Sequence, residues 1–142
     1  MAIDDWLLET ADEPILRVYE WEQHWGSLGC FCPLNQSIES FDGIEWVRRS
    51  TGGGIVDHQN DWTYTLVIPE TDLFARISAR VSYQVIHNVL SFVLSDRFNL
   101  SLNGYSQSEL GGICFQKAVE FDLVDAVGNK IAGAGQRRTK HG

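Results

Sequence analysis

The sequence predicts a domain of the α+β (α/β) class on the basis of three patterns. First, apolar side chains recur every four residues over residues 73–94, which indicates one long amphipathic helix. Second, short segments rich in β-branched and aromatic residues precede and follow this helix. Third, glycine and proline separate these segments from one another. Strands on both sides of a single long helix favour this class.

The elements before the long helix begin with a short helix, expected over residues 3–10, where apolar residues share one side. Five strands are expected next, over residues 16–21, 26–31, 45–49, 54–58 and 62–68. The third and fourth of these flank a run of glycines, and we expect a tight turn to join them. Pro69 ends the fifth strand, because proline cannot donate to a strand ladder.

The long helix is expected to have about six turns, with Thr71 or Asp72 as its N-cap. Its stripe consists of Leu73, Ile77, Val81, Val85, Val89 and Val93. Strands are expected after it over residues 100–102, 112–115, 119–124 and 130–134. The turn Val127-Gly128-Asn129 separates the last two.

Length and charge restrict the classes of protein to which the chain can belong. Its 142 residues suit a single domain over residues 1–142. A net charge of -8 argues against nonspecific binding to nucleic acid or to an anionic membrane. No apolar run is long enough to span a bilayer, and the acidic N-terminus lacks the basic region of a signal peptide. We therefore expect a cytoplasmic protein.

The three cysteines are Cys30, Cys32 and Cys114. An odd number in a cytoplasmic chain argues against a disulfide framework. Cys30 and Cys32 form a single C-x-C pair without a second pair, which is a weak signal for metal binding. We expect structural thiols there and no metal site.

The run of glycines is the first candidate site. Three consecutive glycines permit positive φ angles and close approach of the backbone to a ligand, and their N–H groups can bind an anionic or carbonyl oxygen. Arginines precede the run and a histidine follows it, so the candidate residues are Arg48, Arg49, Ser50, Thr51, Gly52, Gly53, Gly54 and His58. Spacing alone fits a glycine-rich hairpin with exposed arginines equally well.

The segment Arg-Arg-Ser-Thr-Gly-Gly-Gly at residues 48–54, with His58 and the sequence Asp-Trp-Thr-Tyr-Thr at 61–65, resembles the lipoate–protein ligase and octanoyltransferase family. Further blocks resemble the same family in the same order, at residues 1–8, 14–21, 114–115, 121–124 and 128–138. Together the blocks cover nearly the whole chain. The resemblance implies a fold shared with the catalytic domains of biotin–protein ligases, which have a mixed β-sheet core with flanking helices.

The resemblance also implies roles for individual residues. The loop 48–54 would enclose the acyl chain and its activated head, and Lys130 would hydrogen-bond the acyl carbonyl or a phosphate. An ammonium group at that position suits acyl transfer, which builds negative charge on the carbonyl oxygen. Asp122, Gly133 and Ala134 lie in the same blocks and are candidate substrate-binding residues. On spacing alone, Lys130 would be an ordinary surface lysine.

Two chemistries fit this family. A ligase would use ATP and Mg²⁺ to activate free lipoate as lipoyl-AMP and would then modify a lysine of a lipoyl domain or a glycine-cleavage H-type protein. An octanoyltransferase would take octanoate from octanoyl-acyl carrier protein without a cofactor, and one branch forms a thioester on a cysteine. Cys114 is the candidate nucleophile, although it fits a buried strand cysteine equally well. We expect the ligase first and the transferase as the alternative.

The chain ends soon after Arg137 and Arg138, whereas family members usually continue. This suggests that the part completing the sheet and covering the acyl site is missing. The resulting expectations are a homodimer, a complementing subunit of a split enzyme, or a non-catalytic acyl-binding domain.

Overall fold

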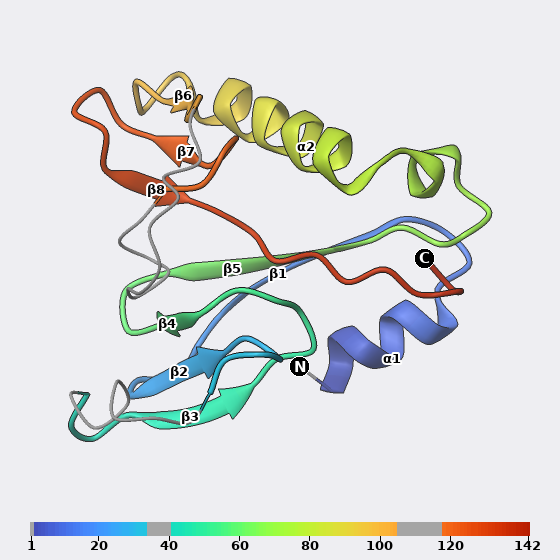
Figure 1. The fold of residues 1–142 in the computed structure, drawn as a ribbon, viewed down its shortest axis with the longest axis horizontal. Helices are drawn as coiled ribbons and strands as arrows, with labels where there is room; N and C mark the ends of the chain where they lie inside the picture. The colour runs from blue at the N-terminus through green and yellow to red at the C-terminus, as the bar shows by residue number, and fades with distance from the viewer. Residues whose placement is uncertain (1, 34–40, 105–117) are drawn as a thin grey trace. The chain divides into compact units, whose positions relative to one another are not determined.

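The computed structural model of the chain describes residues 2–33, 41–104 and 118–142 (Figure 1). Its elements, in chain order, are α1 (Ala2–Thr10), β1 (Ile15–Glu20), β2 (Trp25–Leu28), β3 (Glu45–Arg48), β4 (Ile55–Asp57), β5 (Trp62–Val67), the 3₁₀-helix η1 (Leu73–Arg76), α2 (Ala79–Leu94), β6 (Ser101–Leu102), β7 (Leu123–Val124) and β8 (Lys130–Ala132). Helices combined with parallel and antiparallel strand pairs confirm the predicted α+β class. Among the described residues, no helix is long and apolar enough to cross a membrane.

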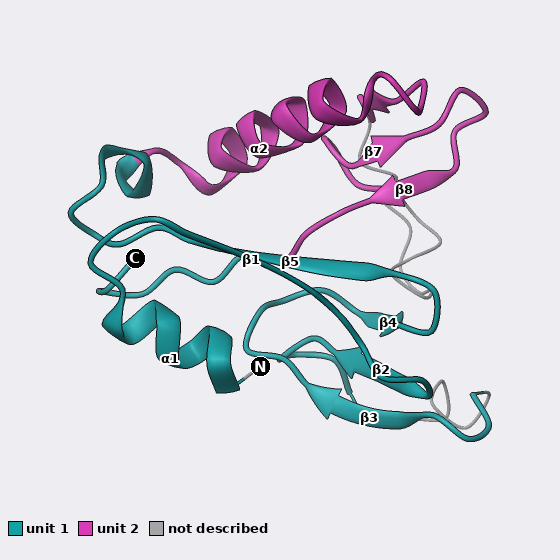
Figure 2. Ribbon diagram, turned by 180° about the vertical axis from the view of Figure 1, so that it is seen from behind, with its two compact units in different colours: residues 1–76, 136–142 teal, residues 77–135 magenta. Residues whose placement is uncertain are grey.

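The described chain divides into two compact units, residues 1–76 with 136–142 and residues 77–135 (Figure 2). In the first unit, β1 and β5 pair antiparallel from Ile15 opposite Val67 to Glu20 opposite Trp62. Both strands were expected. Side chains along β1 alternate in exposure, but its apolar Leu16 and Val18 lie on the more exposed face, at 65% and 57%. The Nη1 atom of Arg17 lies 2.8 Å from Oδ1 of Asp4, which ties α1 to β1.

The second sheet of this unit has the strand order β3-β2-β4. β2 pairs parallel with β3 and antiparallel with β4, so β2 is the central strand and is largely buried. The prediction that a tight turn joins β3 to β4 is therefore wrong, because these strands lie on opposite edges of β2. The glycine-containing connection instead crosses the end of β2.

The chain end belongs to the first unit. The Glu70 N–H donates to the His141 carbonyl over 2.9 Å, and Nη1 of Arg138 donates to the Ala75 carbonyl over 3.2 Å. An ion pair of 2.8 Å joins Arg137 to Asp5. Residues 136–142 are thus bonded to α1 and to the segment between β5 and α2.

The long helix of the second unit, α2, is shorter than predicted. Asp72 does cap a turn, since its Oδ1 accepts from the Phe74 N–H over 2.7 Å, but this turn is the 3₁₀-helix η1. Ser78 is extended, with φ -64° and ψ 153°, and its side chain caps α2 by accepting from the Val81 N–H. The apolar period thus continues across two separate helices, because Asp72 caps the first and Ser78 caps the second.

The apolar stripe on α2 does not face the interior in the described chain. Val81, Val85, Val89 and Val93 are 42%, 39%, 56% and 65% exposed. The buried residues of this helix are Ser82 and His87. The helix therefore points a polar face inward, and that face forms part of the site described below.

The third sheet has the strand order β6-β7-β8, with antiparallel pairs and an irregularity within β7. Its last turn was predicted: Gly128 has φ 90°, and the Asp125 carboxylate accepts from the Val127 and Asn129 N–H groups. The strand predicted over residues 119–124 shortens to β7, because a turn closed by the Asp122 N–H on the Val119 carbonyl precedes it. The strand predicted over residues 112–115, with Cys114, lies outside the described residues.

Candidate functional site

The glycine loop, residues 49–54, is held to the end of β2 by three backbone hydrogen bonds. The Arg49 N–H donates to the Leu28 carbonyl over 2.8 Å. The Cys30 and Gly29 N–H groups donate to the carbonyls of Thr51 and Gly54 over 2.9 and 3.0 Å. The loop is therefore a fixed part of the sheet end.

Two positions around this loop require glycine. Gly53 has φ 96°, a conformation that side chains rarely adopt. A Cβ atom on Gly29 would lie 1.9 Å from the Gly53 carbonyl oxygen. By contrast, a Cβ atom on Gly52 would meet nothing within 4 Å. The glycines thus serve both backbone conformation and the close approach of two chain segments.

Both arginines before the glycines direct their donors at backbone carbonyls. The Arg49 guanidinium donates to the carbonyls of Gly52 and Gly54, each over 3.0 Å, and to Oγ of Ser27, also over 3.0 Å. Nη1 of Arg48 donates to the carbonyls of Gly29 and Cys32 over 2.8 and 2.7 Å. These contacts make the arginines internal braces of the loop, and their contact with a substrate stays a prediction.

His58 lies beside this loop in a chain of buried polar contacts. Its Nδ1 atom is 2.8 Å from Oδ2 of Asp61, and its Nε2 atom is 2.8 Å from Oγ of Ser27. One pattern satisfies all groups: Arg49 donates to Ser27, Ser27 donates to His58, and His58 donates to Asp61. The indole of Trp21 stacks on the imidazole with ring centroids 4.0 Å apart and an interplanar angle of 5°.

The Ser27–His58–Asp61 chain has the connectivity of a nucleophilic triad, but its serine is poorly placed to attack a substrate. Ser27 is only 1% exposed. Its oxygen also accepts from Arg49, which draws electron density away from a nucleophile. The chain is better suited to holding the imidazole ring and the glycine loop in one arrangement.

The second unit contains an ion pair between Lys130 and Asp122. Nζ of Lys130 lies 2.8 Å from Oδ2 of Asp122, with the two side chains 12% and 0% exposed. The Asp122 carboxylate also accepts from the Val119 N–H over 2.8 Å and from the Tyr83 hydroxyl over 2.5 Å. The buried carboxylate therefore has three donors, as a buried charge requires. The Lys130 side chain is buried except for this 12%.

Gly133 leaves the space that this ion pair occupies. A Cβ atom on Gly133 would lie 2.6 Å from Cε of Lys130 and 2.7 Å from both Nζ of Lys130 and Oδ1 of Asp122. The next residue, Ala134, donates its N–H to the Tyr83 hydroxyl over 2.9 Å. Gly133 and Ala134 thus shape the surroundings of the Lys130 ammonium through backbone and through an absent side chain.

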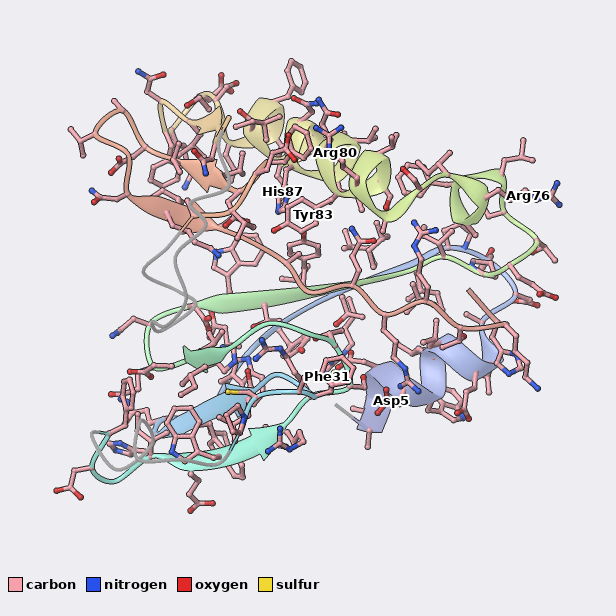
Figure 3. All side chains as sticks on the ribbon, viewed as in Figure 1. Asp5, Phe31, Arg76, Arg80, Tyr83 and His87 are labelled. Carbon is pink, nitrogen blue, oxygen red and sulfur yellow. The ribbon has the colours of Figure 1, made fainter. Side chains whose placement is uncertain are left out.

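His87 borders this cluster on α2, and Figure 3 shows it projecting from the same side of the helix as Tyr83. The two rings meet edge to face, with centroids 4.1 Å apart and an interplanar angle of 72°. His87 is 0% exposed, and neither ring nitrogen has a hydrogen-bond partner among the described residues. Burial lowers the pKa of His87, and the nearby Lys130 lowers it further while Asp122 raises it. The ring is therefore neutral at neutral pH.

The residues predicted from the sequence fall into two groups. Residues 48–54 and His58 lie together in the first unit. Asp122, Lys130, Gly133 and Ala134 lie together in the second unit. Sequence reasoning missed four participants: Trp21, Ser27, Asp61 and Tyr83. For Asp61, its position three residues after His58 offered a signal, whereas nothing local marks the other three.

The family model described as "Lipoyl protein ligase A/B catalytic domain" matches residues 1–142. The chain belongs to this family. Membership confirms the resemblance that the glycine-loop and lysine blocks suggested. No solved structure is significantly similar to this one.

Curated relatives of this lipoyl protein ligase family member carry the name octanoyltransferase LipM. The protein of Lysinibacillus sphaericus is 30% identical over an alignment of 160 residues, gaps included, which covers 99% of this chain and 56% of the relative. That of Carboxydothermus hydrogenoformans is 33% identical over 153 residues, covering 97% and 55%. That of Staphylococcus aureus is 29% identical, covering 99% and 56%. The chain thus spans about half the length of the curated relatives that it matches.

Proposed function

We propose that this chain provides the acyl-transfer machinery of a protein octanoyltransferase, which moves an octanoyl group from acyl carrier protein to a lysine of a lipoyl-domain or glycine-cleavage H-type protein. The observation that carries the proposal is the Lys130–Asp122 pair, held around Gly133 within a chain of the lipoyl protein ligase family. The names of the relatives support octanoyl transfer.

Lys130 supplies positive charge for the reacting carbonyl. Attack on an acyl thioester places negative charge on the carbonyl oxygen, and a fixed ammonium group stabilises that oxyanion more than it stabilises the neutral substrate. Because Asp122 is fully buried, it acts through Lys130 by fixing the ammonium position. The Lys130 side chain is 12% exposed, whereas that of Asp122 is fully buried, so Lys130 is the member of the pair proposed to meet the substrate.

Cys114 is the proposed nucleophile on the grounds of its position in the family block. Its thiolate attacks the thioester carbonyl, so that a new carbon–sulfur bond forms and the bond to the carrier sulfur breaks. The carrier leaves as a thiolate and takes a proton. The acceptor lysine amine then attacks the octanoyl-cysteine, which forms the amide and returns the cysteine thiol.

The glycine loop and His58 are proposed to border the acyl chain. The fixed attachment of the loop to β2 supports this role, since a rigid loop presents its backbone to a ligand without an ordering cost. The pathway through thioesters needs no ATP or Mg²⁺. Transfer therefore replaces ligation as the leading function, because the relatives are named octanoyltransferases rather than ligases.

The decisive experiment presents an apo lipoyl domain with two donors in parallel, octanoyl-acyl carrier protein alone and lipoate with ATP and magnesium. Mass spectrometry of the acceptor lysine measures the product. We expect octanoylation from the carrier and no lipoylation with ATP. Lys130→Met, which keeps the length of the side chain and removes its charge, should slow transfer by about a hundredfold or more. Modification only in the ATP reaction would overturn the proposal in favour of a ligase.

A further inference from the structure

We propose that Tyr83 is a positioning residue for this reaction: its hydroxyl fixes the Asp122 carboxylate and the backbone at Ala134, and thereby the Lys130 ammonium. The inference rests on the proposed function for its effect on turnover. Its structural part, the control of Lys130 by Tyr83, can be measured without any substrate.

The Tyr83 hydroxyl joins three segments that are distant in sequence. It donates to Oδ1 of Asp122 over 2.5 Å, and it accepts from the Ala134 N–H over 2.9 Å. The donor comes from α2, the carboxylate from the turn before β7, and the N–H from the segment after β8. One hydroxyl therefore links Asp122, the partner of the Lys130 ammonium group, to the backbone at Ala134.

The contact matters because Asp122 has no exposed surface. Its two oxygens serve Tyr83, the Val119 N–H and Lys130, so loss of the tyrosine hydroxyl would leave Oδ1 without that donor. A buried carboxylate that loses a donor rotates or moves to recover one. Lys130 would move with it, since the ammonium is bonded to the other oxygen.

A second contact shows that α2 positions the same turn. The guanidinium of Arg80 lies 4.8 Å from the centre of the Phe121 ring and pairs with the Glu120 carboxylate. Phe121 has φ 69°, which is unusual for a bulky residue and sends the next side chain, Asp122, into the interior. Figure 3 shows Arg80, Tyr83 and His87 on the helix that makes these contacts.

The ring of Tyr83 is itself fixed. The Tyr83 and His87 rings pack in a T-shaped arrangement with their centroids 4.1 Å apart, and His87 is fully buried. The hydroxyl therefore points at Asp122 without freedom to swing away. Tyr83→Phe keeps this packing and removes only the hydroxyl, which makes it a specific test.

The test measures how readily Lys130 reacts with an amine-acylating reagent. Wild-type protein and Tyr83→Phe are treated briefly with acetic anhydride, and mass spectrometry gives the modification of Lys130 relative to the exposed Lys140 in the same chain. We expect the ratio to rise several-fold in the variant, because a displaced ammonium leaves its buried partner. An unchanged ratio would overturn the proposal.

Turnover gives the second measurement, with octanoyl-acyl carrier protein and an apo lipoyl domain. We expect Tyr83→Phe to lower kcat about tenfold while KM changes little, since the misplaced ammonium is needed at the transition state. Because an unfolded fraction would also expose Lys130, the ratio is measured on folded protein isolated by gel filtration, where a general loss of folding lowers only the yield. A fall in kcat without a change in Lys130 reactivity would therefore contradict the positioning role.

Two further variants keep the test decisive. Asp122→Asn removes the negative charge that holds Lys130, so it should also raise the Lys130 ratio. No rise in this variant would refute the control of Lys130 through Asp122, even if Tyr83→Phe fails to fold. Tyr64→Phe is the matched control, because burial raises the pKa of Tyr64 to about 12 and its hydroxyl has no partner among the described residues. It should leave both measurements unchanged. If wild type transfers no octanoyl group, the proposed function fails while the labelling ratio still decides the role of Tyr83.

Discussion

Gly133→Ala tests whether the site is built around the space beside Lys130. The added methyl would lie 2.6 Å from Cε of Lys130 and 2.7 Å from Oδ1 of Asp122, far inside contact distance. Gly133 is not among the residues with positive φ, so its backbone accepts alanine and the effect is steric. The methyl can be accommodated only if both the Lys130 side chain and the Asp122 carboxylate shift from their paired positions.

The expected cost follows from the burial of the pair. Forcing an extra methyl into a packed site costs about 1–3 kcal/mol. The higher values apply where the displaced ammonium leaves a buried charge behind, and Asp122 is 0% exposed. The Val119 and Tyr83 donors remain on the carboxylate and keep the cost below that of an isolated charge. For a chain of this size the change in melting temperature is roughly 4–12 °C.

The assay is thermal and urea unfolding followed by circular dichroism, with Gly104→Ala as control. Among the described residues, a Cβ atom on Gly104 meets nothing within 4 Å, so that variant should match wild type or gain about 0.4–1 kcal/mol through the unfolded state. Octanoyl transfer should fall in Gly133→Ala and persist in Gly104→Ala. Equal stability of the two variants would show that the added methyl costs nothing beside Lys130, and would contradict the expected steric cost.

Three further predictions concern the buried polar groups. Replacing His87 by leucine should raise stability by about 1–3 kcal/mol in urea unfolding, because both ring nitrogens lack partners among the described residues; a loss would reveal a hidden partner. The lowered pKa of His87 means that the unfolded chain binds the proton more readily, so stability should fall as pH drops below about 6.5. The His87→Leu variant should show less of this fall in a pH series of melting curves. Arg49→Lys should cost about 1–3 kcal/mol, since lysine cannot reach two loop carbonyls and Ser27 together; an unchanged melting curve would contradict its bracing role.

The sequence predicted most features that depend on local chemistry. The short first helix, the β1 and β5 strands and the turn at residues 127–129 follow from periodicity and turn residues, and the structure confirms them. The predicted start of the long helix was wrong because Asp72 and Ser78 are both residues that can cap a helix. Local pattern does not decide between two such caps.

Features that depend on distant partners were not predictable. The route of the glycine loop across β2 is set by bonds between Gly29 and Gly54 and between Cys30 and Thr51, far apart in sequence. Tyr83 reaches Asp122 across 39 residues. The family blocks identified Lys130 and the loop, whereas the residues that hold them, Tyr83 and Ser27, emerge only from the fold.

Intact-mass measurement shows whether an octanoyl group passes through a thioester on Cys114 under the influence of Lys130. The chain is incubated with octanoyl-acyl carrier protein without acceptor, then examined before and after hydroxylamine. We expect one octanoyl adduct that hydroxylamine removes, formed more slowly in Lys130→Met and absent in Cys114→Ser. Absence of an adduct on wild-type protein that still octanoylates a lipoyl domain would show that transfer does not pass through this thioester.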